Sequence, residues 1–231
     1  MMDKVFWQDP YQTQLVTRVA QVDRDEVSLE STIFFAFSGG QESDTGTLAG
    51  LPVLQARKHG LDIFYLLPSG HGLTVGDEVA LAIDWLRRQR LMRLHFAAEM
   101  VLQLVCQLHP GIQRIGAHIA QDKARIDFAL DVNIGALFSR IEAQAAQLVA
   151  EDRPIVCEFT DVAAQRRLWR VDGFAQMPCG GTHPRTTGEV GSIRLKRKNI
   201  GKGKERVEVY LVEDRKIVQD DCRIDHLTLR S

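Results

Sequence analysis

The sequence predicts an α+β protein in which a small β-rich part precedes a part that mixes helix and strand. Up to about Val79 the chain consists of short β-like runs separated by glycine-rich connectors, a pattern typical of a small barrel or curled sheet. From Asp84 to His109 it continues without glycine or proline, which favours one long helix. We therefore expect two domains, residues 1–85 and residues 86–231.

Composition limits the possible functions. The 231 residues are 45% hydrophobic and 26% charged, with a net charge of −1, as in an ordinary soluble globular protein. Any contact with nucleic acid must therefore come from a local basic patch. The chain opens without a secretory signal and shows no apolar run of membrane length. Its four cysteines are too sparse for a disulfide scaffold, so we expect a cytoplasmic protein with reduced thiols and no membrane partner: Cys106, Cys157, Cys179 and Cys222.

The expected strands of the first domain are short runs rich in β-branched and aromatic residues. They are LVTRVAQV (15–22), EVSLEST (26–32), IFFAF (33–37) and DIFYLL (62–67). The segments SGGQESDTG (38–46) and SGHGLTVGD (69–77) read as glycine-rich connectors.

The second domain is expected to begin with the long helix, which Pro110 and Gly111 end. Its apolar residues recur at spacings of three and four, so the helix is amphipathic: Leu91, Leu94, Ala98, Val101, Leu102 and Val105. The remaining expected elements are a hairpin-like pair (114–120 and 124–130), a helix over about 134–151 capped by Asn133, and strands at 169–174, 191–199 and 205–212.

Two pairs of residues are candidate metal ligands. Cys179 and His183 lie in the segment CGGTH and offer a thiolate and an imidazole, but two ligands cannot complete a tetrahedral zinc site. The long helix offers His95 and Glu99, which share one face at i and i+4. The residues alone also allow a buried thiol near a loop histidine and a surface His–Glu pair. The flanking residues 96–98, Phe-Ala-Ala, favour a packed face.

Four motifs, in order along the chain, resemble the stand-alone (AlaX-type) alanyl-tRNA editing proteins, which are related to the editing domains of alanyl- and threonyl-tRNA synthetases. They are SGGQESDTG (38–46), MRLHFAAEM (92–100), RIDF (125–128) and CGGTHPRTTGEVGSI (179–193). The last motif is the most specific. The resemblance implies a small β-barrel-like domain followed by an α/β two-layer editing core. It also implies one Zn²⁺ and hydrolysis of the ester that joins a wrong amino acid, serine or glycine, to alanine tRNA.

The resemblance also implies a metal-binding role for four residues. The family's ligands are two helix histidines and the cysteine and histidine of the loop. His95, Cys179 and His183 occupy three of these positions, and Glu99 replaces the second helix histidine. We expect the Glu99 carboxylate to face the point on which the other three converge, either as the fourth ligand or as a general base. The third alternative is an empty site in which Glu99 pairs with His95 or a nearby arginine.

The glycine-rich motif and the loop supply further expected site residues. Gln41 is expected to point toward the substrate, and Thr182 to give a hydrogen bond near the reacting centre. Gly39 and Gly40 would let the backbone approach the terminal adenosine of the tRNA. The residues alone also allow a tight hairpin at 38–46 and simple turn chemistry at Thr182.

A basic run follows the CGGTH loop directly. Because it contains a flexible turn and many cations, it is expected to hold phosphates of the tRNA acceptor end, although such a run is also typical of a solvated face. Its residues are Arg194, Lys196, Arg197, Lys198, Lys202 and Lys204. Arginines at the start of the long helix would extend this patch: Arg87, Arg88, Arg90 and Arg93.

The leading interpretation is a metal-dependent trans-editing hydrolase that deacylates seryl- or glycyl-tRNA(Ala), or both. Two alternatives stay open. One is a tRNA-binding protein on the same fold with weakened catalysis, of which Glu99 would be the symptom. The other is a zinc hydrolase of small activated esters that does not use tRNA.

Overall fold

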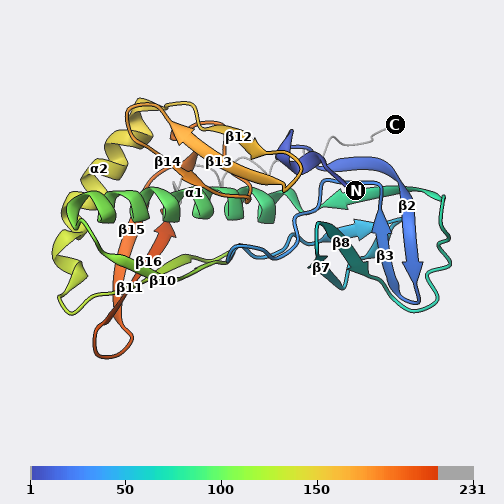
Figure 1. Ribbon diagram of the computed structural model, residues 1–231, viewed down its shortest axis with the longest axis horizontal. Coiled ribbons are helices and arrows are strands. Elements are labelled where there is room, and N and C mark those ends of the chain that lie inside the picture. Colours follow the sequence, from blue (N-terminus) through green and yellow to red (C-terminus); the bar gives the residue numbers. More distant parts are fainter. Residues whose placement is uncertain (1, 213–231) are drawn as a thin grey trace, which may run out of the picture.

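The computed structural model describes residues 2–212, so Cys222, one of the cysteines expected to be reduced, lies outside the described residues. Figure 1 shows an elongated molecule, with a curled sheet at one end and two further sheets arranged around a long helix at the other. The protein is thus a mixed α/β structure in which strands greatly outnumber the two α-helices of the described chain.

The curled sheet contains seven antiparallel strands in the order β6-β5-β9-β2-β3-β8-β7. Their bounds are β2 (Gln14–Asp23), β3 (Glu26–Leu29), β5 (Gly46–Leu48), β6 (Leu51–Pro52), β7 (Gln55–His59), β8 (Asp62–Leu66) and β9 (Glu78–Ile83). A short parallel pair and a 3₁₀ turn accompany the sheet: β1 (Asp3–Lys4), β4 (Ser31–Thr32) and η1 (Val5–Trp7). The sheet is curled (Figure 1), and it is open because its two end strands, β6 and β7, are not paired with each other.

The expected strand at 33–37 is wrong. These residues are buried up to position 36 but have no strand partner. Side chains satisfy their backbone instead: the amide of Phe34 donates to Oγ1 of Thr32 at 2.9 Å, and that of Phe35 donates to Oδ2 of Asp44 at 2.6 Å. A run of apolar residues shows that a segment is buried, but it does not show which groups pair with its backbone.

Helix α1 (Trp85–Leu108) runs through the second half of the molecule, and Asp84 caps it by accepting a hydrogen bond from the amide of Arg87 at 3.1 Å. By length and composition α1 is long enough and apolar enough to cross a membrane, although we expected no such segment. However, 72% of its most apolar stretch is buried inside the fold. We therefore interpret α1 as the central core helix.

An antiparallel four-stranded sheet, in the order β10-β11-β16-β15, packs against α1. A three-stranded antiparallel sheet, β12-β13-β14, also meets the helix, where the rings of Phe96 and Trp169 make an edge contact at 5.1 Å. The strands are β10 (Gln113–Ile119), β11 (Ala124–Ala129), β12 (Val156–Asp161), β13 (Arg166–Val171), β14 (Ala175–Pro178), β15 (Ile193–Asn199) and β16 (Lys204–Leu211). The second helical segment starts as η2 (Ile134–Leu137), which Asn133 caps as expected, and continues as α2 (Phe138–Glu151). A short 3₁₀ turn, η3 (Gly188–Val190), precedes β15.

Two clusters of buried hydrophobic side chains form the core. One lies within residues 2–83 and fills the curled sheet, and the other lies within residues 91–211 and surrounds α1. The expected domain boundary near residue 85 stays a prediction.

A buried ion pair lies where the two clusters approach each other. The side chains of Arg88 and Asp44 are both fully buried, and Nε of Arg88 donates to Oδ1 of Asp44 at 2.9 Å. Arg88 also donates to the carbonyl oxygens of Pro10 and Ile33. The expectation that Arg88 extends a surface patch is therefore wrong, because its charge is used inside the fold.

Candidate metal centre

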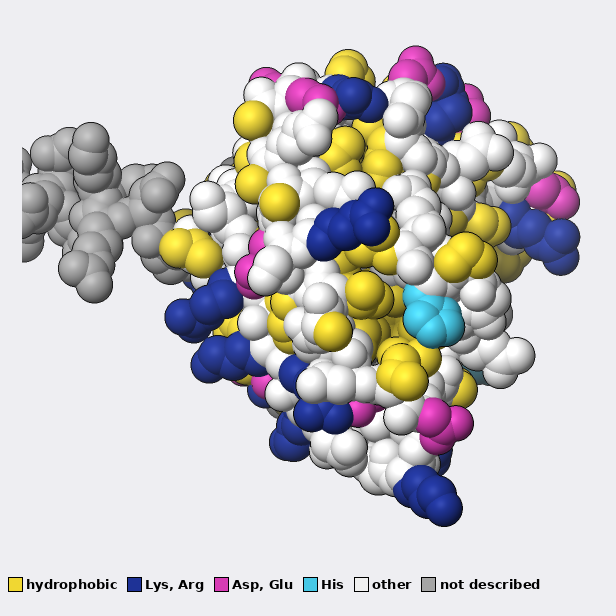
Figure 2. All heavy atoms as spheres, turned by 90° about the vertical axis from the view of Figure 1, so that its left-hand side faces the viewer, with side chains coloured by type: hydrophobic (Ala, Val, Ile, Leu, Met, Phe, Trp, Pro, Cys, Tyr) yellow, Lys and Arg dark blue, Asp and Glu magenta, His cyan; other side chains and the backbone are white. Residues whose placement is uncertain are grey.

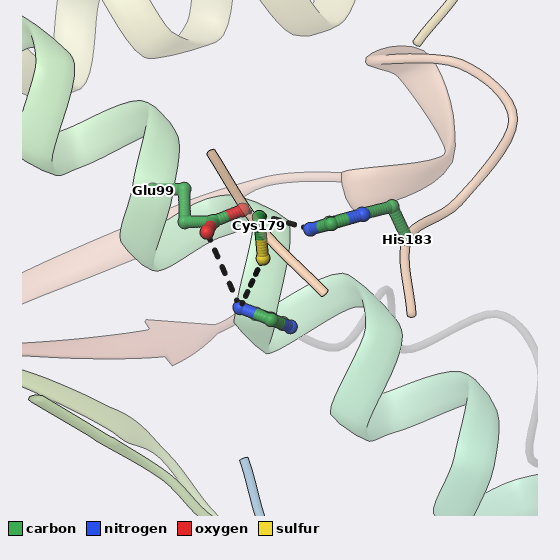
Figure 3. A group of neighbouring side chains, drawn as sticks. Glu99, Cys179 and His183 are labelled. Atoms are coloured by element: carbon green, nitrogen blue, oxygen red, sulfur yellow. Dashed lines mark hydrogen bonds and ion pairs between the residues drawn. The ribbon is translucent and has the colours of Figure 1, made fainter. Parts of the chain in front are cut away.

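Four potential metal ligands from two segments of the chain lie together beside α1. His95 and Glu99 come from α1, Cys179 directly follows β14, and His183 lies in the loop beyond it. One ligand atom from each residue lies within 4.8 Å of the others. Figure 3 shows the side chains of Glu99, Cys179 and His183 pointing toward one another. The structure thus brings together all four residues that the sequence proposed as ligands, while their role in binding a metal stays a prediction.

Local geometry explains why these segments can meet. Positions i and i+4 of a helix share a face, so His95 and Glu99 point to the same side of α1. The loop approaches this face closely at Gly181. A Cβ atom there would lie 2.1 Å from Cε1 of His95 and 2.8 Å from Oε1 of Gln41. Glycine is therefore required at position 181 for the loop to reach the helix.

The distances between the four groups are partly those of neighbouring ligands and partly those of a hydrogen-bonded ion pair. Nε2 of His95 lies 3.6 Å from Sγ of Cys179 and 3.3 Å from Oε1 of Glu99. Nε2 of His183 lies 2.8 Å from Oε2 of Glu99. Two ligands that each lie 2.0–2.3 Å from a tetrahedral ion are about 3.3–3.8 Å apart. The two distances from His95 lie in this range, whereas Glu99 and His183 are closer, as in a hydrogen-bonded ion pair. One thiol, two imidazoles and one carboxylate are also the ligand types that zinc prefers. The site therefore fits a metal ion.

The four side chains are buried, and their charges control one another's protonation. Burial lowers the pKa of His95, but the carboxylate of Glu99 and the thiol of Cys179 outweigh burial and raise this pKa to about 9. Burial raises the pKa of Glu99, but His95 and His183 hold it well below its usual range. The carboxylate of Glu99 is therefore ionised, as a metal ligand requires.

The same balance acts on the loop residues. Burial and the Glu99 carboxylate raise the pKa of Cys179. His95 and His183 lower it by more than this rise, so the pKa of Cys179 lies below its ordinary value. Burial lowers the pKa of His183, whereas Cys179 and Glu99 raise it well above its ordinary value. The thiolate is thus favoured, and each imidazole must release a proton when it binds a metal.

Gln41 lies behind His95, as part of the centre. Its Oε1 lies 2.7 Å from Nδ1 of His95 and accepts a hydrogen bond from the amide of Thr182 at 3.2 Å. Its Nε2 donates to Oγ1 of Thr182 at 2.9 Å. Both Gln41 and Thr182 are almost fully buried. Their expected contacts with substrate stay predictions, whereas their contacts with each other and with His95 are explicit in the structure.

Cys157 is a site residue that sequence reasoning missed. It lies on β12, and its Sγ is 3.5 Å from Nδ1 of His183. His183 and His95 therefore share one arrangement, in which Nε2 faces the cluster and Nδ1 faces a partner outside it. Such outer partners fix the orientation and the tautomer of a metal-binding histidine. Nothing in the spacing of Cys157 from the CGGTH loop indicates this contact.

A cavity of about 200 Å³ opens onto the cluster. Its walls come from the glycine-rich motif, α1, β10, β11, β14 and the CGGTH loop: Ser38, Gly39, His95, Ala98, Glu99, Leu102, Arg114, Ala117, Ile119, Ile126, Met177, Pro178, Cys179, Gly180 and Gly181. Gly39 lines the cavity, while its expected closeness to the tRNA stays a prediction. Gly40 packs on β10, where a Cβ atom would lie 2.8 Å from the carbonyl oxygen of Ala117.

The basic run forms β15, the start of β16 and the turn between them. In the four-stranded sheet the residues in register with Lys196 are Glu208, Arg125 and His118, one from each strand. Neighbouring positions such as Ile126 are buried against α1. Because side chains alternate between the two faces of a strand, this row lies on the outer face. The outer face thus joins the basic run to β10, the strand beside the cavity.

Some cations of this region already have acidic partners. Arg197 pairs with the carboxylate of Glu205, and Arg206 pairs with Asp127 at 2.6 Å. Lys196 instead lies 4.9 Å above the ring of Tyr210. Figure 2 views the left-hand end of Figure 1 and shows lysine and arginine side chains along its margin. They reach its lowest part, where Figure 1 places the β15–β16 turn.

Comparisons with known proteins agree on one family. Residues 167–208 match the family described as the threonyl and alanyl tRNA synthetase second additional domain. The alanyl-tRNA editing protein AlaX-M of Pyrococcus horikoshii is 31% identical over 215 residues, which cover 91% of this chain and 98% of that protein. AlaX-M of Methanosarcina barkeri is 30% identical over 244 residues, covering 92% of this chain and all of that protein (100%). An alanine–tRNA ligase of Methanococcus vannielii is 27% identical over 225 residues, covering 88% of this chain and 25% of the ligase.

Proposed function

This chain belongs to the alanyl-tRNA editing protein family, and from that membership we propose that it hydrolyses the ester bond of mischarged alanine tRNA. The proposed substrates are seryl- and glycyl-tRNA(Ala), the site of action is the cytoplasm, and residues 86–231 form the catalytic domain beside a β-rich domain of residues 1–85. One observation carries the proposal: the cluster of His95, Glu99, Cys179 and His183 lies against a cavity that the glycine-rich motif helps to line.

We infer that the four residues hold one Zn²⁺. When bound, the ion would supply Lewis-acid activation of an aminoacyl ester, whose carbonyl is already reactive. The chain's own contribution is to orient the ligands: Gln41 accepts the Nδ1 proton of His95, and Cys157 lies where it accepts that of His183. Both imidazoles then present Nε2 to the ion.

Glu99 has two possible tasks at this centre. As a ligand, its carboxylate and the Cys179 thiolate together balance the charge of a divalent ion. As a general base, one carboxylate oxygen accepts a proton from the attacking water. We favour the ligand role, because a carboxylate is an acceptable replacement for imidazole at zinc. Thr182 and the amides of the loop are proposed to donate hydrogen bonds close to the ester oxygen.

The tRNA is proposed to lie along the outer face of the four-stranded sheet. Arg194, Lys196 and Lys198 project from β15 toward this face, and Lys202 and Lys204 lie in and beside the turn. Their positive charges would neutralise backbone phosphates. Arg197 is proposed to contribute less than the others, because its charge is already paired with Glu205.

The decisive experiment measures deacylation of seryl- and glycyl-tRNA(Ala) by the purified protein, together with its metal content. We expect release of the amino acid, about one zinc per chain, and loss of both in Cys179→Ala. Binding of tRNA without deacylation would instead support a tRNA-binding protein with weakened catalysis.

A charge-reversal variant distinguishes the proposed tRNA deacylase from a hydrolase of small esters. Reversing Lys196 and Lys198 to glutamate should abolish deacylation of tRNA, because the phosphates would be repelled. If the protein hydrolyses serine methyl ester but never seryl-tRNA(Ala), and this reversal changes nothing, the tRNA substrate is wrong.

A further inference from the structure

Phe37 is an exposed aromatic residue that directly precedes two residues of the cavity wall. Its side chain is 55% exposed, although the four residues before it are buried. The next two residues, Ser38 and Gly39, line the cavity. A large apolar ring that is left in water directly before a cavity wall suggests a contact made only when a substrate binds.

A second ring stands beside Phe37. The ring of His118 on β10 lies 6.3 Å from it, with 37° between the two planes. His118 directly follows Ala117, another residue of the cavity wall, but its own side chain points to the outer face of the sheet. Nε2 of His118 lies 3.2 Å from Oε1 of Glu42, whose other oxygen pairs with Arg87 at 2.8 Å. The histidine is therefore held in place by a chain of polar contacts.

Backbone hydrogen bonds fix the two segments that carry these rings. The amide of Phe37 donates to Oγ of Ser43 at 2.7 Å. The amide of Ile119 donates to the carbonyl oxygen of Gly40 at 2.7 Å, and the amide of Glu42 donates to the carbonyl oxygen of Ile119 at 3.0 Å. The glycine-rich motif thus continues the sheet beyond β10. The rings of Phe37 and His118 are presented on a rigid rim, so little ordering would be needed on binding.

The two rings of Phe37 and His118, called the rim here, form a surface on which a nucleobase can stack. An ester that reaches His95 and Glu99 through the cavity belongs to the terminal ribose of a tRNA, so the base on that ribose must lie close to the cavity mouth. The amino acids proposed for this site, serine and glycine, have no apolar part for an exposed aromatic ring to contact. Every base has a π-face that stacks on aromatic side chains.

The charged side chains on the outer face of the four-stranded sheet are consistent with RNA that leads to this position. His118 belongs to the row that continues through Arg125 and Glu208 to Lys196 on the outer face, and the carboxylate of Glu208 is paired with Lys123 at 2.8 Å. A strand of RNA that places its last base at the rim can therefore carry its preceding phosphates over these cations. We propose that Phe37, flanked by His118, is the platform on which the terminal adenine of the tRNA stacks. This inference rests on the proposed function.

The test uses alanine tRNA in which 2-aminopurine replaces the terminal adenine, since stacking on an aromatic ring changes its fluorescence. We expect a fluorescence change with the wild-type protein, its loss in Phe37→Ala and its retention in Phe37→Trp. On seryl-tRNA(Ala), kcat/KM should fall about tenfold in Phe37→Ala, which corresponds to about 1.4 kcal/mol. Leu54→Ala, which removes another exposed apolar side chain (59% exposed), is the matched control and should change neither readout.

The two proposals fail differently. If Phe37→Ala keeps both the fluorescence change and the wild-type kcat/KM, the platform is wrong while the deacylase stands. If the wild-type protein deacylates no tRNA, the proposed function fails. The binding signal then still decides whether the terminal base stacks on Phe37.

Discussion

Oε2 of Glu99 lies 2.8 Å from Nε2 of His183, and this contact joins the long helix to the loop that carries the thiol. Two substitutions distinguish the roles of this carboxylate. If Glu99 is a ligand, Glu99→His should keep the zinc, whereas Glu99→Gln should lose much of it, because a neutral amide is a weaker ligand. Metal content and deacylation rate are measured for both variants.

A general base gives the opposite pattern for Glu99→Gln, in which the zinc stays and the rate falls. If neither substitution changes the metal content or the rate, Glu99 has no part in the chemistry.

Cys157 is expected to position His183. Cys157→Ala removes the partner of Nδ1, and zinc affinity measured by competition with a chelator should fall about 10- to 100-fold. Cys157→Ser should keep most of the affinity, because a hydroxyl oxygen also accepts this hydrogen bond. Cys106→Ala changes another partly buried free thiol of the described chain and is the control. Equal losses in the serine and alanine variants would mean that the sulfur acts as a ligand itself.

The buried pair of Asp44 and Arg88 should dominate the electrostatic contribution to stability. Asp44→Asn leaves the Arg88 charge without its counter-ion in the core, and the free energy of unfolding should fall by about 3–5 kcal/mol. Urea unfolding measures this loss. Glu78→Gln breaks the exposed pair with Arg18 and should cost at most about 1 kcal/mol. Similar losses in the two variants would contradict the importance of burial.

Binding of tRNA should depend on which cations are already paired. Replacing Lys196 and Lys198 by alanine should weaken affinity. It should also make the slope of log K against log salt shallower, by about 0.7–0.9 for each phosphate that the protein no longer neutralises. Arg197→Ala should have a smaller effect, because Arg197 pairs with Glu205. Filter binding at several salt concentrations compares the variants. An unchanged slope in the double variant would show that the run is only a solvated surface.

Because Lys4 is buried, we predict that the free energy of unfolding rises in alkaline solution. Burial, and then the charge of Lys58, lower the pKa of Lys4 from 10.5 to about 8 in the folded protein. Between these pH values the unfolded chain binds more protons at this position than the folded chain, so the free energy of unfolding rises with pH. Lys4→Met should remove this contribution. Urea unfolding of both proteins across this range tests it: their difference should shrink as the pH rises, and a constant difference would contradict the shift.

The sequence correctly predicted that the four candidate ligands lie together, because their signals are local. His95 and Glu99 follow from helix periodicity, and Cys179 and His183 lie within one short segment. Cys157 could not be found in this way, because it meets His183 only through the pairing of β12 with β13 and the path of a separate loop. Contacts across a sheet depend on register, which the spacing along the chain does not reveal.

The arginine-rich start of α1 shows a second limit. Arg87 and Arg88 look alike in the sequence, and both were expected at the surface. Which of them turns inward depends on the rotation of α1 against the core and on the presence of Asp44 from a distant segment. For the same reason the apolar run at 33–37 was expected to be a strand, although side chains from elsewhere satisfy its backbone.

Gln41 gives the centre a dependence on assembly. It lies in the part of the chain that holds the first hydrophobic cluster, yet its amide group contacts His95 and Thr182 in the second half of the molecule. The four candidate ligands all lie in the second half, but His95 gains its Nδ1 partner only after both halves have folded and docked. In a nascent or partly unfolded chain His95 would lack this partner, so an ordered centre is expected only in the fully assembled protein.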